Sequence, residues 1–164
     1  MQAIVHPQGR LVLGGLVFRA TLGRGGVTGE KREGDGATPA GLLPLRRVLY
    51  RADRVRTPDC AVPAEPIAPN DGWCDDPSSA DYNRMVRLPH DGSYEELWRQ
   101  DALYDLVGVL GWNDAPVQRG RGSAIFLHVA RGDYGPTEGC VALALDDLQR
   151  VLAAGLTEVL VLPS

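Results

Sequence analysis

Cys140 and His128 have the types and the spacing of a thiol nucleophile and its proton acceptor. Cys140 directly follows Gly139, and a glycine lets the backbone turn sharply, so that successive N–H groups point the same way and can hold a developing oxyanion. His128 interrupts the apolar run Ser123–Ala130, and Cys140 lies twelve positions later, after turn-forming glycines. A thiol paired with an imidazole is a good acyl acceptor, so this pair predicts acyl transfer.

Spacing alone leaves other interpretations of the cysteines open. A free cysteine is among the most buried residue types, so Cys140 is also consistent with plain core packing. Cys60 and Cys74 compete as nucleophiles, although neither follows a glycine. These two thiols either bridge in an oxidising compartment or stay free. The cysteines and histidines lack metal-ligand spacing, so no zinc site and no cofactor is expected.

Other catalytic motifs are missing or incomplete. Gly36–Gly41 has the glycine spacing of a phosphate-binding loop, but Leu42 stands where the motif needs lysine. No G-x-S-x-G pentapeptide is present, which argues against a serine hydrolase of that type. A paired-carboxylate site has no positive evidence.

Charge is unevenly divided along the chain. Residues 1–57 hold ten Lys/Arg against four Asp/Glu, whereas residues 58–164 hold seven against seventeen. The basic half could meet an anionic ligand, but charge dispersed over the surface is the more ordinary interpretation. The chain as a whole carries a net charge of −4 and has no basic run, so nucleic acid is not an expected partner.

The length of 164 residues and the 32 glycines and prolines favour a loop-rich β fold. We expect one domain over residues 1–164, mostly β with short helices, and a monomer. Apolar runs predict strands, and Asp105–Trp112 and Ser123–Ala130 read as strands buried on both faces. The other expected strands are residues 2–5, 10–22, 42–51 and 157–162. The glycine-rich residues 23–41 predict a long functional loop.

Three helical segments are expected. Ser93 and Glu96 form a capping box that predicts a helix through Leu103. Residues 78–84 predict a short helical turn. Asp146 is the expected cap of a last helix, with Gly155 just beyond its end.

No run is apolar and long enough for a transmembrane helix. Leu11–Phe18 follows Arg10 like the core of a signal peptide, but no small-residue cleavage site follows it, so no signal peptide is expected within this numbering.

The residues around the pair resemble a known family. Ile125–His128 followed by Pro136–Leu143 is similar to the signature of the L,D-transpeptidase family, the YkuD-like catalytic domain, which has a His, a short span and then Ser/Thr-x-Gly-Cys. Further blocks resemble the same family and extend the likeness over most of the chain: Gly29–Gly41, Gly72–Pro77, Tyr82–Arg84 and Leu103–Val107.

The resemblance implies a β-rich, sandwich-like fold and a cysteine acyltransferase that acts on peptidoglycan stem peptides in the periplasm or cell envelope. Cys140 would be the nucleophile and His128 the acid and base. The N–H groups of Gly139 and Cys140 would hold the oxyanion, and the carbonyl of Val129 would orient the imidazole. Substrate contacts are expected from Thr137, Glu138, Tyr82, Asn83, Arg84 and Asn113. A carbapenem would be expected to form an adduct on Cys140.

Two departures from the family pattern point to an atypical branch. Glu138 stands where the family often has His, and Ala142 where it often has Arg or Asn. Glu138 would either receive an ammonium group of the substrate or bind an arginine. Three functions follow: a transpeptidase that makes 3–3 or 1–3 cross-links, an L,D-carboxypeptidase that hydrolyses the same thioester, or a non-catalytic wall-binding module.

Overall fold

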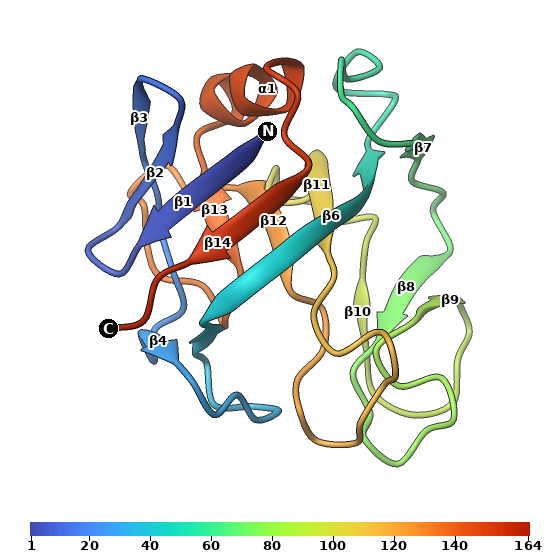
Figure 1. The fold of residues 1–164 in the computed structure, drawn as a ribbon. Helices are drawn as coiled ribbons and strands as arrows, with labels where there is room; N and C mark the ends of the chain where they lie inside the picture. The colour runs from blue at the N-terminus through green and yellow to red at the C-terminus, as the bar shows by residue number, and fades with distance from the viewer.

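The computed structural model describes residues 1–164, which form one large curled sheet, two smaller sheets and one helix (Figure 1). The strands of the nine-stranded sheet follow the order β13-β12-β11-β6-β14-β1-β2-β3, with β7 beside β6. Their bounds are β1 Gln2–His6, β2 Arg10–Leu13, β3 Leu16–Arg19, β6 Gly41–Tyr50, β7 Ala64–Pro66, β11 Leu106–Leu110, β12 Phe126–Val129, β13 Val141–Leu143 and β14 Glu158–Val161. The expectation of a mostly β fold is confirmed.

The two ends of this sheet order meet close to Cys140. Thr21, which follows β3, exchanges backbone hydrogen bonds of 2.8 and 2.9 Å with Ala142 of β13. Arg24 donates its N–H to the carbonyl of Thr137, and Thr137 donates its N–H to the carbonyl of Leu22. The segment before Cys140 is therefore held by the chain that follows the first hairpins.

The concave face of the curled sheet encloses the main aliphatic core. Alternate side chains of the strands, such as Leu127 and Val129 of β12, belong to this core. The helix α1, Leu145–Ala153, covers it with Leu148, Val151 and Leu152. Burial of this large apolar surface is the main term that stabilises the fold.

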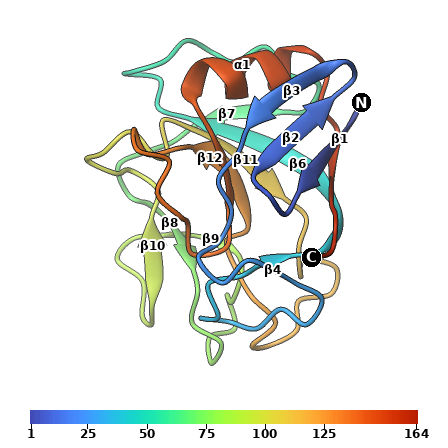
Figure 2. The ribbon, with the colours of Figure 1, turned by 90° about the vertical axis from the view of Figure 1, so that its left-hand side faces the viewer.

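A smaller, more aromatic core lies on the other side of β11 and β12. It contains Trp73, Tyr104, Phe126 and Cys140. The three-stranded sheet of β8 (Asp71–Cys74), β9 (Met85–Arg87) and β10 (Tyr94–Glu96) lies on this side, opposite β1–β3 (Figure 2).

Apart from Gly41, which begins β6, the glycine-rich residues 23–41 include only the short strands β4 (Val27–Thr28) and β5 (Thr38–Pro39), which form a two-stranded sheet. The predicted loop is therefore largely correct. No helix in the structure has both the length and the apolar character needed to cross a membrane.

Two predicted helices are wrong. Tyr94–Glu96 is a strand paired with Gly72–Cys74, and the Ser93 hydroxyl donates to Asp75 instead of capping a helix. Residues 78–84 form a series of turns rather than a helix. The last helix is present but begins at Leu145, one residue before Asp146, and Gly155 follows it with a φ of 96°.

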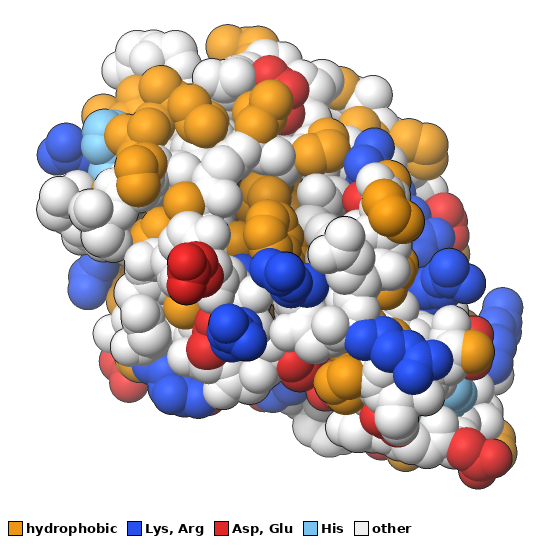
Figure 3. Space-filling view, turned by 60° about the horizontal axis from the view of Figure 1, so that its bottom comes forward, with side chains coloured by type: hydrophobic (Ala, Val, Ile, Leu, Met, Phe, Trp, Pro, Cys, Tyr) orange, Lys and Arg blue, Asp and Glu red, His pale blue; other side chains and the backbone are white.

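Charged side chains of opposite sign are interspersed over the face drawn in Figure 3. Ion pairs join the basic first part of the chain to the acidic remainder: Arg24–Glu138, Arg46–Asp114 and Arg54–Asp105. The folded chain thus pairs part of the positive charge of residues 1–57 with negative charge from the rest of the chain. All three cysteines are free, so Cys60 and Cys74 form no disulfide.

Candidate active site

Cys140 lies at the end of a tight turn that leads into β13. Gly139 has a φ of 138°, and a Cβ on it would lie 2.8 Å from the carbonyl oxygen of Ala37. A side chain is therefore excluded both by backbone conformation and by the close approach of the glycine-rich loop. Thr137 closes the turn, because its Oγ1 accepts the Gly139 N–H at 3.1 Å and donates to the Cys140 carbonyl at 2.7 Å.

These hydrogen bonds decide which of the two expected backbone N–H groups is free to hold the oxyanion. The N–H of Gly139 is committed to Thr137, which leaves it unavailable in this conformation. The N–H of Cys140 makes no hydrogen bond within the chain. Of the two predicted donors, Cys140 is therefore the one that is free to bind a ligand.

The Cys140 sulfur is buried but borders a cavity. The residue is 8% exposed, its thiol donates to the Ala124 carbonyl at 3.2 Å, and the Phe126 N–H lies 3.4 Å from the sulfur. Burial, with a smaller contribution from the negative charge of Glu95, raises the pKa of the thiol to about 12. The resting sulfur is therefore protonated at neutral pH.

His128 lies on the same face of the sheet as Cys140. It pairs in register with Ala142 of β13, and the side chains of His128, Ala142 and Cys140 all line one cavity. The Nδ1 of His128 lies 2.9 Å from the carbonyl oxygen of Val129, as the resemblance implied. A carbonyl only accepts hydrogen bonds, so Nδ1 carries the proton and Nε2 is the basic nitrogen. Burial lowers the pKa of His128 to about 4.

A cavity of about 200 Å³ brings these groups together. Cys140, His128, Thr137 and Glu138 all line it, so four of the predicted site residues share one space. The other lining residues are mainly charged or small: Glu33, Glu95, Arg99, Leu103, Tyr104, Ser123, Ala124, Arg131, Gly135, Pro136 and Ala142.

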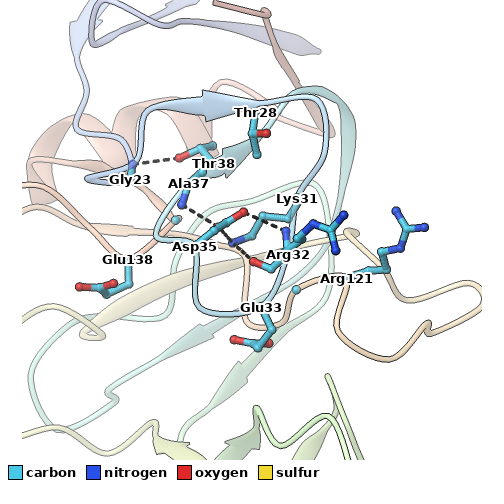
Figure 4. Close-up of polar contacts among 12 residues, drawn as sticks. Gly23, Thr28, Lys31, Arg32, Glu33, Asp35, Ala37, Thr38, Arg121 and Glu138 are labelled. Atoms are coloured by element: carbon cyan, nitrogen blue, oxygen red, sulfur yellow. Dashed lines mark hydrogen bonds and ion pairs between the residues drawn. The ribbon is translucent and has the colours of Figure 1, made fainter.

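The glycine-rich loop forms one wall of this cavity through Glu33. Figure 4 shows Lys31 turned across the loop toward Asp35 and the Arg32 carbonyl, whereas Glu33 points away from the loop. One Glu33 oxygen accepts hydrogen bonds from the hydroxyls of Tyr82 and Ser123, both at 2.7 Å. The internal Lys31–Asp35 pair thus stiffens the loop that presents Glu33.

The remaining predicted contact residues lie outside the cavity. Tyr82 is buried and reaches only the carboxylate of Glu33 and the N–H of Gly122. The Asn83 side chain joins Trp73, Ala124 and the chain at Trp112 and Asn113. These bonds use its side-chain groups, which indicates a structural role.

Arg84 and Asn113 also lie away from Cys140. Arg84 is exposed and lines a separate cavity with Arg46 and Arg47. The Asn113 side chain holds its own loop by bonding to Gln118 and to the Gly122 carbonyl. Glu138, by contrast, lines the active cavity and forms an ion pair of 2.9 Å with Arg24, so of its two expected roles the structure contains the arginine contact.

Sequence reasoning missed Glu33, Glu95 and Tyr104 as members of this cavity. Tyr104 packs its ring edge-on against His128, with centroids 5.3 Å apart, and its hydroxyl donates to Glu95 at 3.0 Å. Glu95 lies in a segment whose capping-box pattern predicts a helix, so its inward position on a strand was not expected. No local pattern marks a carboxylate that reaches the site from a separate sheet.

The comparison with protein families agrees with this geometry. Residues 3–161 match YkuD, the L,D-transpeptidase catalytic domain. Because the match covers nearly the whole sequence, the chain belongs to the L,D-transpeptidase catalytic domain family. Members of this family are transpeptidases that act on peptidoglycan peptides. A search among curated proteins finds no match to this chain.

Proposed function

We propose that this protein is an L,D-transpeptidase that cross-links peptidoglycan stem peptides through a thioester on Cys140. The observation that carries the proposal is that the Cys140 thiol and the His128 imidazole line one cavity, the imidazole from β12 and the thiol from the turn before β13. In this proposal residues 1–164 act as one monomeric catalytic domain in the periplasm or cell envelope.

The first half of the reaction forms the acyl-enzyme. The Cys140 thiol transfers its proton to Nε2 of His128 as the sulfur attacks the carbonyl of an L-residue that is followed by a D-residue. The Cys140 N–H stabilises the oxyanion that develops. His128 then gives the proton to the leaving amine, and a thioester remains.

Proton transfer and attack are coupled in this scheme. The raised pKa of Cys140 and the lowered pKa of His128 keep both groups neutral at rest, so no preformed thiolate–imidazolium pair is available. The same burial keeps the thiol protonated, and a protonated thiol reacts slowly with other electrophiles.

The second half transfers the acyl group to an amine of another stem peptide. The link is 3–3 when the donor is cut after its third residue and 1–3 when it is cut after the first. Hydrolysis by water would instead make the protein an L,D-carboxypeptidase. Neutral His128 can act as the base in transpeptidation and in hydrolysis, because it can take a proton from an amine or from water.

The test is to incubate wild type and Cys140→Ala with muropeptides and to analyse the products by mass spectrometry. Dimers that only the wild type produces would support transpeptidation, and their fragmentation would distinguish 3–3 from 1–3 links. Shortened monomers would indicate hydrolysis. Products that are identical for both proteins would contradict the proposal and favour a wall-binding module.

A further inference from the structure

Glu95 is a carboxyl group in the active cavity that has no ion-pair partner in the chain. It lies on β10 between Tyr94 and Glu96, which are both exposed, and alternation along the strand turns Glu95 inward. Its Oε1 accepts the Tyr104 hydroxyl at 3.0 Å. Its Oε2 has no hydrogen-bond partner and is not fully enclosed, and Glu95 lines both the active cavity and a second pocket that it shares with Arg99 and Asp101.

The cations around this cavity do not neutralise Glu95 directly. Arg99 lines the cavity, but its Nε and Nη2 donate to Asp101, at 2.8 and 2.7 Å, and it forms no ion pair with Glu95. Arg131 also lines the cavity and forms no ion pair with Glu95. Glu33 lies in the same cavity and adds a second negative charge.

A half-buried carboxylate without an ion-pair partner is costly, and a cationic ligand that enters the cavity would reduce that cost. Burial, first, and the charges of Asp75 and Glu33 raise the pKa of Glu95, against the opposing effects of the Tyr104 hydrogen bond and the charge of Arg99. Tyr104 fixes the position of the carboxyl group and also touches the His128 ring. The carboxyl group is thus held in the cavity that Cys140 and His128 also line.

We propose that Glu95, held by Tyr104, binds the ammonium group of the acyl acceptor beside the thioester of Cys140. The inference rests on the proposed function and adds to it the group that selects an amine over water. A charge-assisted hydrogen bond from the ammonium to Oε2 would retain the acceptor in the cavity while His128 removes a proton.

The atoms and charges of the transfer balance with these groups. The bound ammonium loses one proton to Nε2 of His128 and becomes a neutral amine. Its nitrogen forms a bond to the thioester carbonyl as the carbon–sulfur bond breaks. The second proton from nitrogen moves to the Cys140 sulfur, and the proton on His128 is released to water.

The same site affects the nucleophile. The charge of Glu95 disfavours the Cys140 thiolate, and an ammonium bound at Oε2 would cancel that charge. Formation of the Cys140 thiolate as leaving group therefore costs less free energy when the acceptor ammonium is bound.

The experiment measures how one acyl-enzyme divides between two products. Wild type is acylated with a synthetic donor peptide, and glycinamide is added as a small primary amine. The ratio of amide to free acid is read by mass spectrometry. Because both products come from the same thioester, the ratio does not depend on how fast each variant is acylated.

Glu95→Gln should lower the amide-to-acid ratio at least tenfold while hydrolysis continues, which also shows that the variant is folded. Glu95→Asp should retain part of the ratio because it keeps the charge. Glu96→Gln, the exposed neighbour on β10, is the matched control and should match wild type. An unchanged ratio in Glu95→Gln, with wild type still forming amide, would overturn the ammonium site alone. Absence of any acyl-enzyme on wild-type Cys140 would overturn the proposed function and this inference together.

Discussion

The two faces of β12 serve different purposes. Leu127 and Val129 point into the aliphatic core that α1 covers, whereas Phe126 and His128 point to the aromatic side that holds Cys140. The first face is sealed by regular elements with matching apolar side chains. The second is covered by loops and a small sheet that bring in Glu33, Glu95 and Tyr104.

This difference shows how one strand can carry both stability and chemistry. The aliphatic face contributes by apolar burial, which is non-directional and scales with the apolar area removed from water. The aromatic face contains polar groups whose hydrogen bonds fix direction, such as His128 to Val129 and Tyr104 to Glu95. Substitutions on the first face should change stability, and substitutions on the second should change turnover.

The largest effect is expected for His128→Gln. Loss of the acid and base should reduce turnover about 10³-fold, because positioned proton transfer contributes on that scale. The unfolding midpoint in urea at pH 7 should change little, since glutamine can still bond to the Val129 carbonyl. Turnover close to wild type would contradict the division of roles between the two faces.

Leu127→Ala tests the opposite face of the same strand. Leu127 is fully buried, so the substitution should lower the free energy of unfolding by about 2–5 kcal/mol. Protein that remains folded should keep most of its turnover. Leu42→Ala is the control, because Leu42 is 52% exposed and its loss should alter urea unfolding only slightly.

Acid should weaken the molecule partly through His128. Its pKa is about 4 in the folded protein and about 6.5 in an unfolded chain, so below pH 6.5 the unfolded state binds the extra proton. This contribution is complete above pH 6.5 and is lost as pH falls toward 4, by about 3 kcal/mol. Urea unfolding from pH 7 to pH 4 should therefore show a steeper loss for wild type than for His128→Gln; parallel curves would contradict the low pKa.

Thr137→Val should loosen the nucleophile turn. The substitution removes both bonds of the hydroxyl and leaves the Gly139 N–H unpaired, at a cost of about 1–3 kcal/mol in stability. Turnover should fall because the turn that carries Cys140 is less fixed. Thr137→Ser keeps the hydroxyl and should restore both properties, as measured by urea unfolding and product formation.

Glu138→Gln should have the smallest effect on stability. Glu138 and Arg24 are 78% and 53% exposed, and an ion pair in water contributes less than about 1 kcal/mol. Urea unfolding of this variant and of Arg24→Gln should both lie close to wild type. A large loss in either would show that this pair holds the cavity wall more firmly than its exposure indicates.

The two faces also differ in how far the sequence predicts them. Val107 and Leu127 lie in continuous apolar runs, and their strands follow from that pattern. The Gly139–Cys140 turn and the apolar run around His128 are local signals as well. These features could be predicted because each is encoded within a few neighbouring residues.

The walls of the cavity were not accessible in that way. Ser93 and Glu96 have the local pattern of a helix start, but pairing of Tyr94–Glu96 with β8 overrides it. Asn83 and Tyr82 were expected to contact substrate because Tyr82–Arg84 resembles a block of the family, yet their side chains bond to partners 10 to 49 residues away in sequence. Such long-range hydrogen bonds leave no periodic trace in the sequence.

The most direct test of the central claim is to trap the acyl-enzyme. Wild type, Cys140→Ala and Cys74→Ala are mixed with a carbapenem, and the mass of the intact protein is measured before the modified peptide is mapped. We predict one added acyl group on wild type and on Cys74→Ala, located at Cys140, and none on Cys140→Ala. An adduct that persists in Cys140→Ala, or that maps to Cys60 or Cys74, would contradict the assignment of the nucleophile.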